Sequence, residues 1–187
     1  MNYRKLFLWV EGEDDKRFFE KIIEPEFRKK YNSVETRCYA TLKKDKLGNF
    51  LKSIKAMKAD YIFVADINDS PCITAKKQKI TKEWGKKIVD RDKIVVVIKE
   101  IESWYLAGLK DAECKKFNMP IFDKTDDVTK EQFNSLIPTK KFNSRIDFMI
   151  EILNNFSIEV AVRKNRSFSY FIEKYTSEVS GNIANYG

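Results

Sequence analysis

The amino-acid sequence predicts an α/β fold with a mainly parallel four-stranded sheet flanked by helices. Short apolar segments begin near residues 5, 34, 60 and 93, a spacing of roughly thirty residues. Between them, apolar residues recur at helical spacing, which is typical of right-handed βαβ units. The strand signals stop after Leu109. We therefore expect a core over residues 1–110 and a helical extension over residues 111–187 packed on it, together one compact domain.

The first expected strand, Leu6–Val10, is a continuous apolar run of the kind that a parallel sheet buries on both faces. The turn that follows contains Gly12, where we expect that a side chain would obstruct the chain reversal. A helix is predicted over residues 14–27, because apolar residues recur at helical spacing from Phe18 onward. Pro25 falls near the end of that helix.

The later strands of the core are bounded by turn residues and are rich in β-branched and aromatic side chains. The third strand ends in a turn in which Pro71 prevents continuation, and the helix after it is rich in lysine. The expected elements are the strands Val34–Thr41, Tyr61–Ala65 and Lys93–Ile98, and the helices Leu47–Met57 and Ile73–Trp84.

Past the fourth strand, the sequence predicts helices only. A helix bearing Trp104 and Leu109 is expected to continue over residues 111–118, and the polar tail from Ser177 is expected to be loose. Two further helices are predicted over Phe142–Asn154 and Ser167–Tyr175.

The absence of histidine constrains the chemistry most. It removes the usual general base, the Ser-His and Cys-His nucleophile pairs, and the commonest transition-metal ligand. The three cysteines are far apart and form no C-x-x-C pair, which argues against a disulfide framework and a thiolate zinc site. Catalysis, if present, must use carboxylates, lysine or metal-bound water.

Charge and hydropathy indicate the class of partner. A net charge of +8 favours an anionic partner, and nucleic acid ahead of a membrane, because the basic residues are scattered over several helices. No apolar stretch approaches the roughly twenty residues needed to cross a bilayer, and the N-terminal segment does not resemble a signal peptide. We expect a cytoplasmic protein without a membrane partner.

Acidic residues follow three of the four predicted strands. Glu11 follows the first, Asp66 the third and Glu100 the fourth. The carboxyl ends of parallel strands share one edge, where open α/β sheets bind ligands. Two bare carboxylates ~5 Å apart repel by about 3 kcal/mol at an effective dielectric of 20, so such a cluster needs a counter-charge. Oxygen ligands select Mg²⁺ or Mn²⁺. Alternatively, these acids are ordinary turn residues or favourable charges at helix N-termini.

Several segments carry a family resemblance. VEGEDDKRFF after the first strand, DINDSPC after the third and VVVIKEIESWYLAGLKDAECKKF around the fourth resemble the Toprim fold of topoisomerases, primases and the overcoming-lysogenization-defect nucleases. Together with KNRSFSYFIEKY, they resemble a bacterial and archaeal family of uncharacterised Toprim-like proteins. Members of that family often occur beside ABC-type or AAA-type ATPases in phage-defence settings. The resemblance extends from Phe7 to about Lys174.

The resemblance implies roles for individual acids. Glu11 matches the Toprim glutamate proposed as general base or metal ligand, and Asp66 matches the first acid of the D-x-D motif. Asn68 stands in place of the second aspartate, so the site loses a charge unless Asp69 substitutes for it. The implied catalytic residues are Glu11, Asp66 and Glu102; the implied metal ligands are Glu11, Asp15, Asp66, Asn68, Asp69, Glu100 and Glu102.

The resulting hypothesis is a Toprim-like nuclease that needs Mg²⁺ or Mn²⁺ and hydrolyses phosphodiesters of DNA or RNA. The Asn165–Ser167 motif either contacts phosphate or caps a helix. Two alternatives remain open: a non-catalytic Toprim module that is the partner subunit of an ATPase, and a receiver-like phosphoacceptor domain. The expected nucleic-acid contacts are Lys76, Lys77, Arg163, Lys164, Asn165, Arg166 and Ser167.

Overall fold

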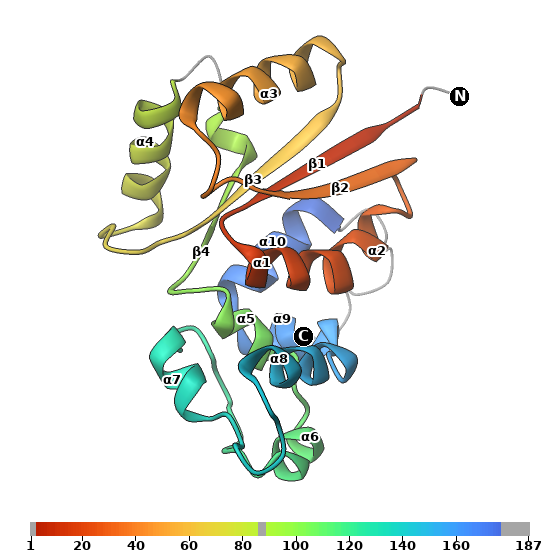
Figure 1. The fold of residues 1–187 in the computed structure, drawn as a ribbon, viewed down its shortest axis with the longest axis vertical. Helices are drawn as coiled ribbons and strands as arrows, with labels where there is room; N and C mark the ends of the chain where they lie inside the picture. The colour runs from red at the N-terminus through yellow and green to blue at the C-terminus, as the bar shows by residue number, and fades with distance from the viewer. Residues whose placement is uncertain (1–2, 86–88, 177–187) are drawn as a thin grey trace, which may run out of the picture. The chain divides into compact units, whose positions relative to one another are not determined.

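The structure, a computed structural model, describes residues 3–85 and 89–176 (Figure 1). The chain divides into two compact units, Met1–Val97 and Ile98–Gly187, and each is described separately below. The division falls at the end of the last strand, whereas the sequence places the end of the core at residue 110. The polar tail from Ser177 lies outside the described residues.

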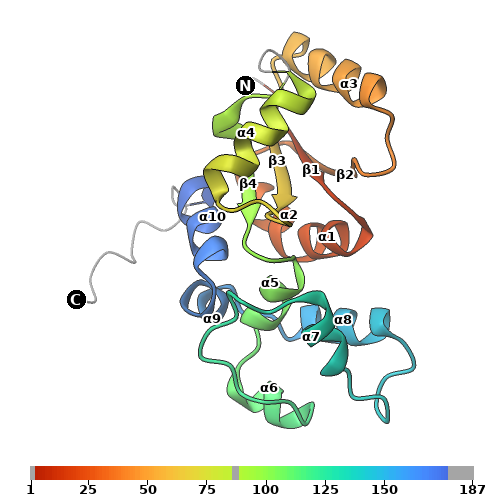
Figure 2. The same ribbon diagram turned by 90° about the vertical axis from the view of Figure 1, so that its left-hand side faces the viewer.

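The first unit contains a four-stranded parallel sheet, with the strand order β2-β1-β3-β4. Helices lie against both of its faces (Figures 1 and 2). The predicted α/β class with a parallel sheet flanked by helices is therefore confirmed. The strands are β1 (Lys5–Val10), β2 (Ser33–Cys38), β3 (Asp60–Asp66) and β4 (Ile94–Val97).

Alternation along the strands divides the core of this unit into two layers. Phe7, Trp9 and Phe63 point to the face covered by α3 (Lys44–Ala56) and α4 (Ile73–Trp84), where they pack with apolar residues of both helices. The intervening residues of β1 and β3 are equally buried on the opposite face. Figure 1 shows the segment between β1 and β2 on that second side. Continuous apolar strands thus reflect burial on both faces.

The sequence predicted one helix over residues 14–27, but the segment after β1 is not one regular helix. It consists of α1 (Glu13–Phe18), a π-helical turn η1 (Phe19–Ile23) and α2 (Glu24–Phe27). The Glu24 N–H donates to the carbonyl of Phe19, five residues back. Pro25 has no N–H and its ring would clash with the carbonyl four residues earlier, so a wider turn relieves that contact.

Smaller differences concern where the elements begin and end. β2 stops at Cys38, three residues earlier than predicted, and α3 begins three residues before Leu47. β4 is limited to Ile94–Val97, because a 3₁₀ turn, η2 (Arg91–Lys93), precedes it. α4 spans the residues that the sequence predicted.

The second unit is helical in the residues described. The predicted helix past Trp104 is interrupted between α5 and α6, and two short helices, α7 and α9, were not predicted. The signals for those two were N-caps: Thr129 with Gln132 forms a capping box, and Ser157 accepts from the Val160 N–H. The helices are α5 (Glu102–Ala107), α6 (Asp111–Lys116), α7 (Lys130–Ser135), α8 (Arg145–Asn154), α9 (Ile158–Lys164) and α10 (Arg166–Thr176).

The core of the second unit centres on Trp104, which is fully buried. Its ring meets Phe168 edge-on at 5.1 Å between centroids and Phe171 at 5.5 Å. Aromatic pairs at such distances stabilise beyond the area they bury. Within the described parts of the chain, no helix has both the length and the apolar character needed to cross a membrane.

Two glycines, the half-buried Gly12 and the buried Gly108, provide a first prediction. A Cβ at Gly108 would lie 2.2–2.5 Å from ring carbons of Phe156, whereas a Cβ at Gly12 would meet nothing closer than the Asp15 carboxylate at 3.7 Å. The expectation that a side chain at Gly12 would obstruct the turn is therefore wrong. Gly108→Ala should lower the free energy of unfolding by about 1–3 kcal/mol through overpacking.

Gly12→Ala serves as the matched control in urea unfolding. It alters only a helix N-cap, so a loss below about 1 kcal/mol is expected. If Gly108→Ala proves as stable as Gly12→Ala, the close packing of Phe156 is incorrect.

Candidate functional site

The strand order places the chain's change of direction between β1 and β3. From β1 the chain moves to β2 on one side, and then crosses to β3 on the other side. The connection that follows β1 and the connection that follows β3 therefore run over opposite faces of the sheet. A crevice opens between them at the carboxyl ends of the strands, where such sheets bind ligands. Glu11 directly follows β1 and Asp66 is the last residue of β3; both are half-buried. The structure thus brings these two predicted site residues to the same edge.

A cavity of about 300 Å³ lies beside this edge, entirely within the first unit. Glu11 and Asn68 line it from the ends of the strands, and Lys76 and Glu83 line it from α4. Aromatic and aliphatic side chains form the rest of its wall: Tyr39, Ala40, Leu42, Phe63, Ala65, Ile80 and Trp84.

The pKa of Tyr39 indicates that the electrostatic potential in the cavity is negative. Its ring stacks on Phe63 at 4.4 Å between centroids. Burial raises the pKa of the Tyr39 hydroxyl strongly, and the negative charges of nearby carboxylates raise it further. Those carboxylates are Glu11, Asp15, Asp66 and Glu83. Four acids therefore act on the hydroxyl of a half-buried tyrosine, and the same negative potential favours a cation.

Asp15 has a structural role in addition to its charge. Its side chain is only 6% exposed, and Oδ2 accepts the Gly12 N–H at 3.2 Å. This hydrogen bond satisfies a backbone donor at the start of α1. Asp15 therefore fixes the turn that carries Glu11, whether or not it also binds a metal ion.

The backbone conformation at position 68 favours asparagine. Asn68 is exposed and has a φ of 48°, in the left-handed region that Asn tolerates better than most residues. The turn closes with the Ser70 N–H donating to the Ile67 carbonyl at 3.1 Å. Asp69 is also exposed in this turn.

Lys76 differs from the other basic residues that the sequence selected. It is only 8% exposed and contributes to the cavity wall, whereas the neighbouring Lys77 is half-buried. A buried ammonium is costly without compensating negative charge, and two acids, Glu11 and Glu83, line the same cavity.

Glu100 and Glu102 belong to the second unit, where both have partners. Glu100 Oε2 accepts the Lys130 N–H at 2.5 Å. Glu102 is 3% exposed, and its Oε1 lies 2.5 Å from the Arg145 guanidinium. The fold of this unit therefore already uses both carboxylates. Their sharing of an ion with Glu11 remains a prediction.

The Asn165–Ser167 motif forms a hydrogen-bond network inside the second unit. Asn165, 1% exposed, donates to Ser103 and Thr125, and its Oδ1 accepts from the Phe168 N–H and the Ser167 hydroxyl at 3.0 and 2.8 Å. The Ser167 hydroxyl in turn accepts the indole N–H of Trp104 at 2.8 Å. Asn165 thus caps the N-terminus of α10 by accepting the Phe168 N–H, as the helix-cap alternative predicted.

The other basic residues of this region vary in exposure. Arg166 is 76% exposed and its Nε donates to Asp126 at 3.3 Å. Lys164 donates to the Leu109 carbonyl at 2.9 Å, and Arg163 is exposed. Nucleic-acid contact by these side chains remains a prediction.

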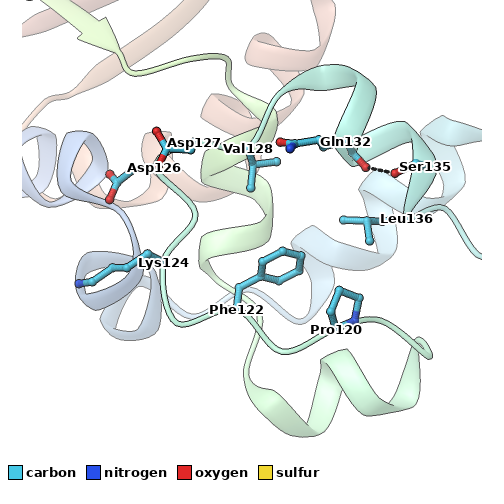
Figure 3. A pocket seen from close by; sticks show the side chains of 9 residues that line it. All are labelled: Pro120, Phe122, Lys124, Asp126, Asp127, Val128, Gln132, Ser135 and Leu136. Carbon is cyan, nitrogen blue, oxygen red and sulfur yellow. Dashed lines mark hydrogen bonds between the residues drawn. The ribbon is translucent and has the colours of Figure 1, made fainter.

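A second cavity, of about 380 Å³, lies in the second unit (Figure 3). Phe122 and Leu136 project into it from opposite walls. At its rim, the buried Asp126 accepts the Arg166 N–H at 2.8 Å, and Lys124 donates to the Arg163 carbonyl. Because Asp126 and Lys124 already form hydrogen bonds within the protein, we consider the cavity beside Glu11 the better candidate for a functional site.

Sequence reasoning missed Tyr39, Glu83 and Trp84 as site residues. The signal for the latter two was the helical repeat of Lys76, Ile80, Glu83 and Trp84 along one face of α4. Tyr39 carried no such signal, because it follows β2 and reaches the site through the pairing of its N–H with the Val10 carbonyl at 2.9 Å.

Comparisons with protein-family models, with curated proteins and with solved structures found no match. Within the described residues, no three acidic or thiol side chains are close enough together to form a complete metal-binding group. The site is therefore interpreted from its own geometry.

The network around Asn165 gives a second prediction. Asn165→Ala should lower the free energy of unfolding by at least about 2 kcal/mol, because the buried Phe168 N–H and Ser167 hydroxyl lose their acceptor, at about 1–3 kcal/mol each. Arg166→Ala, its exposed neighbour, should cost less than about 1 kcal/mol. Equal losses in urea unfolding would contradict the structural role of Asn165.

The buried pair of the second unit gives a pH-dependent prediction. Burial raises the pKa of Glu102 above its ordinary 4.5, although the Arg145 guanidinium opposes this. The folded protein then keeps a proton that the unfolded chain has lost, so stability falls as pH rises above 4.5. In urea unfolding at a series of pH values, the wild type should lose stability relative to Glu102→Gln as the pH rises from 4.5 through the raised pKa of Glu102. A difference that is independent of pH would contradict the shift.

Proposed function

We propose that this protein is a Toprim-like hydrolase that cleaves nucleic-acid phosphodiesters with Mg²⁺ or Mn²⁺ bound between Glu11 and Asp66. The observation that carries the proposal is the position of these two half-buried carboxylates at the end of β1 and the end of β3, beside a cavity. An open α/β sheet binds its ligands at this point.

The donor chemistry of this edge fits a hard divalent cation. Glu11, Asp66 and Asn68 offer only oxygen ligands, and Mg²⁺ is commonly held by one or two carboxylates together with waters and substrate phosphate. A complete protein cage is therefore not required. The negative potential that disfavours ionisation of Tyr39 favours a cation here.

The bound ion would supply an activated water and stabilise charge on the phosphoryl group. The residues of this chain have the supporting roles. Glu11 and Asp66 would hold the ion, and the hydrogen bond that the Gly12 N–H donates to Asp15 fixes the turn next to Glu11. Lys76 balances negative charge at the cavity wall. Basic side chains such as Arg163 and Arg166 are the proposed strand contacts, since both are exposed.

The alternative is a non-catalytic module that acts as partner subunit of an ATPase. Two features favour it. Asn68 is neutral where the motif that the sequence resembles has an acid, and the buried Lys76 lines the same cavity as Glu11. Lys76 would then replace the metal ion.

A cleavage assay separates the two functions. Purified protein should nick plasmid or degrade single strands in Mn²⁺, and Glu11→Gln and Asp66→Ala should each reduce the rate by at least about a hundredfold, a loss of about 2.7 kcal/mol in transition-state stabilisation. Mn²⁺ should also raise the melting temperature of the wild type, and Glu11→Gln should diminish that shift. Asn68→Asp should tighten Mn²⁺ binding.

Exposed acids provide the matched controls. Glu20→Gln on the segment after β1 and Asp123→Ala in the second unit change charge equally and should leave cleavage unchanged. Cleavage that persists undiminished in Glu11→Gln and Asp66→Ala would reject the site. Metal binding without any cleavage would favour the partner-subunit alternative.

A further inference from the structure

The cavity beside Glu11 has features that a metal site does not need. Three aromatic side chains, Tyr39, Phe63 and Trp84, contribute to its wall. Tyr39 and Phe63 stack on each other, with an interplanar angle of 23°. Trp84 is the last residue of α4 and is half-buried. Such rings bind planar, uncharged groups by stacking.

The polar groups of the lining can form hydrogen bonds with a nucleobase. Glu11 and Glu83 contribute carboxylates, Asn68 an amide and Lys76 an ammonium group. Carboxylates accept hydrogen bonds from exocyclic amines of bases, and an asparagine side chain offers both a donor and an acceptor.

The size of the cavity limits the occupant to a single small group. A volume of about 300 Å³ is at the lower end of the ~300–1,000 Å³ range of small-molecule pockets. One nucleobase therefore fits, whereas a base pair within a duplex presents no free ring face to stack on Trp84. Bases become available for such stacking only when they are unpaired.

Resting on the proposed function, we infer that this cavity receives one unpaired base of the strand to be cut, with an exocyclic amine as in adenine or cytosine. Trp84 stacks on the base and Glu83 accepts from its amine, while the adjoining phosphate faces Glu11 and Asp66. The substrate is accordingly a single-stranded segment or an unpaired end, in preference to an intact duplex.

Binding measured without cleavage tests this inference. The probes are short fluorescein-labelled oligomers of dA, dC and dT and a duplex of the same length, titrated in Ca²⁺ and followed by fluorescence anisotropy. Trp84→Leu should weaken binding of the dA and dC strands by about fivefold to a hundredfold. Trp84→Phe should restore most of that affinity, and duplex binding should not change.

Two further variants complete the experiment. Glu83→Gln, at an exposed position, should reduce the preference for dA and dC over dT. Tyr170→Leu removes an aromatic side chain that is 50% exposed in the other unit and should have no effect. Melting temperatures establish that every variant is folded.

The outcomes separate this inference from the proposed function. Unchanged strand affinity in both Trp84→Leu and Glu83→Gln, or an equal loss for strand and duplex, overturns the base pocket even if the wild type cleaves in Mn²⁺. A selective loss in Trp84→Leu supports the base pocket even if the wild type does not cleave, and in that case only the nuclease proposal fails.

Discussion

Parallel pairing of β1 with β2 on one side and β3 on the other is the constraint on which the candidate site depends. It requires the chain to leave β1 toward one face and to leave β3 toward the other. The carboxyl ends of these strands thereby form an open edge that carries Glu11 and Asp66. The buried apolar residues of β1 and β3 hold this edge rigidly, since side chains pack against both faces of each strand.

Charged residues of both signs line this cavity. Lys76 is buried in its wall, and Glu11 and Glu83 line the same space. Burial of an ammonium group is costly without negative charge nearby. Tyr39 remains protonated in this field. A divalent ion and Lys76 would thus serve the same electrostatic need. If a divalent ion balances the negative charge of these acids, the protein is a hydrolase; if Lys76 alone balances it, the protein is a non-catalytic module.

The sequence was sufficient for the fold class because the strands are apolar on both faces and the crossover helices have clear periodicity. It failed where local chemistry overrides periodicity: Pro25 changes the helical hydrogen bonding, and the caps at Thr129 and Ser157 start short helices with little apolar pattern. Glu11 and Asp66 were predicted from their places after strands. Tyr39 was not, since it reaches the site through tertiary pairing that no local pattern encodes.

In the C-terminal motif, residue type alone did not decide between two roles. Asn165 and Ser167 suggested either phosphate contact or helix capping, and the structure gives their side chains partners within the protein. Lys76 was predicted from its charge as a nucleic-acid contact, and it lies buried in the cavity wall. Burial, which depends on the whole fold, assigned these residues to the interior.

The most direct test of the central claim is the anomalous scattering of manganese in crystals soaked with Mn²⁺. The account predicts a peak bound by carboxylate oxygens of Glu11 and Asp66, at the ends of β1 and β3. A peak at other residues only, or no peak at this edge at saturating Mn²⁺, would contradict it.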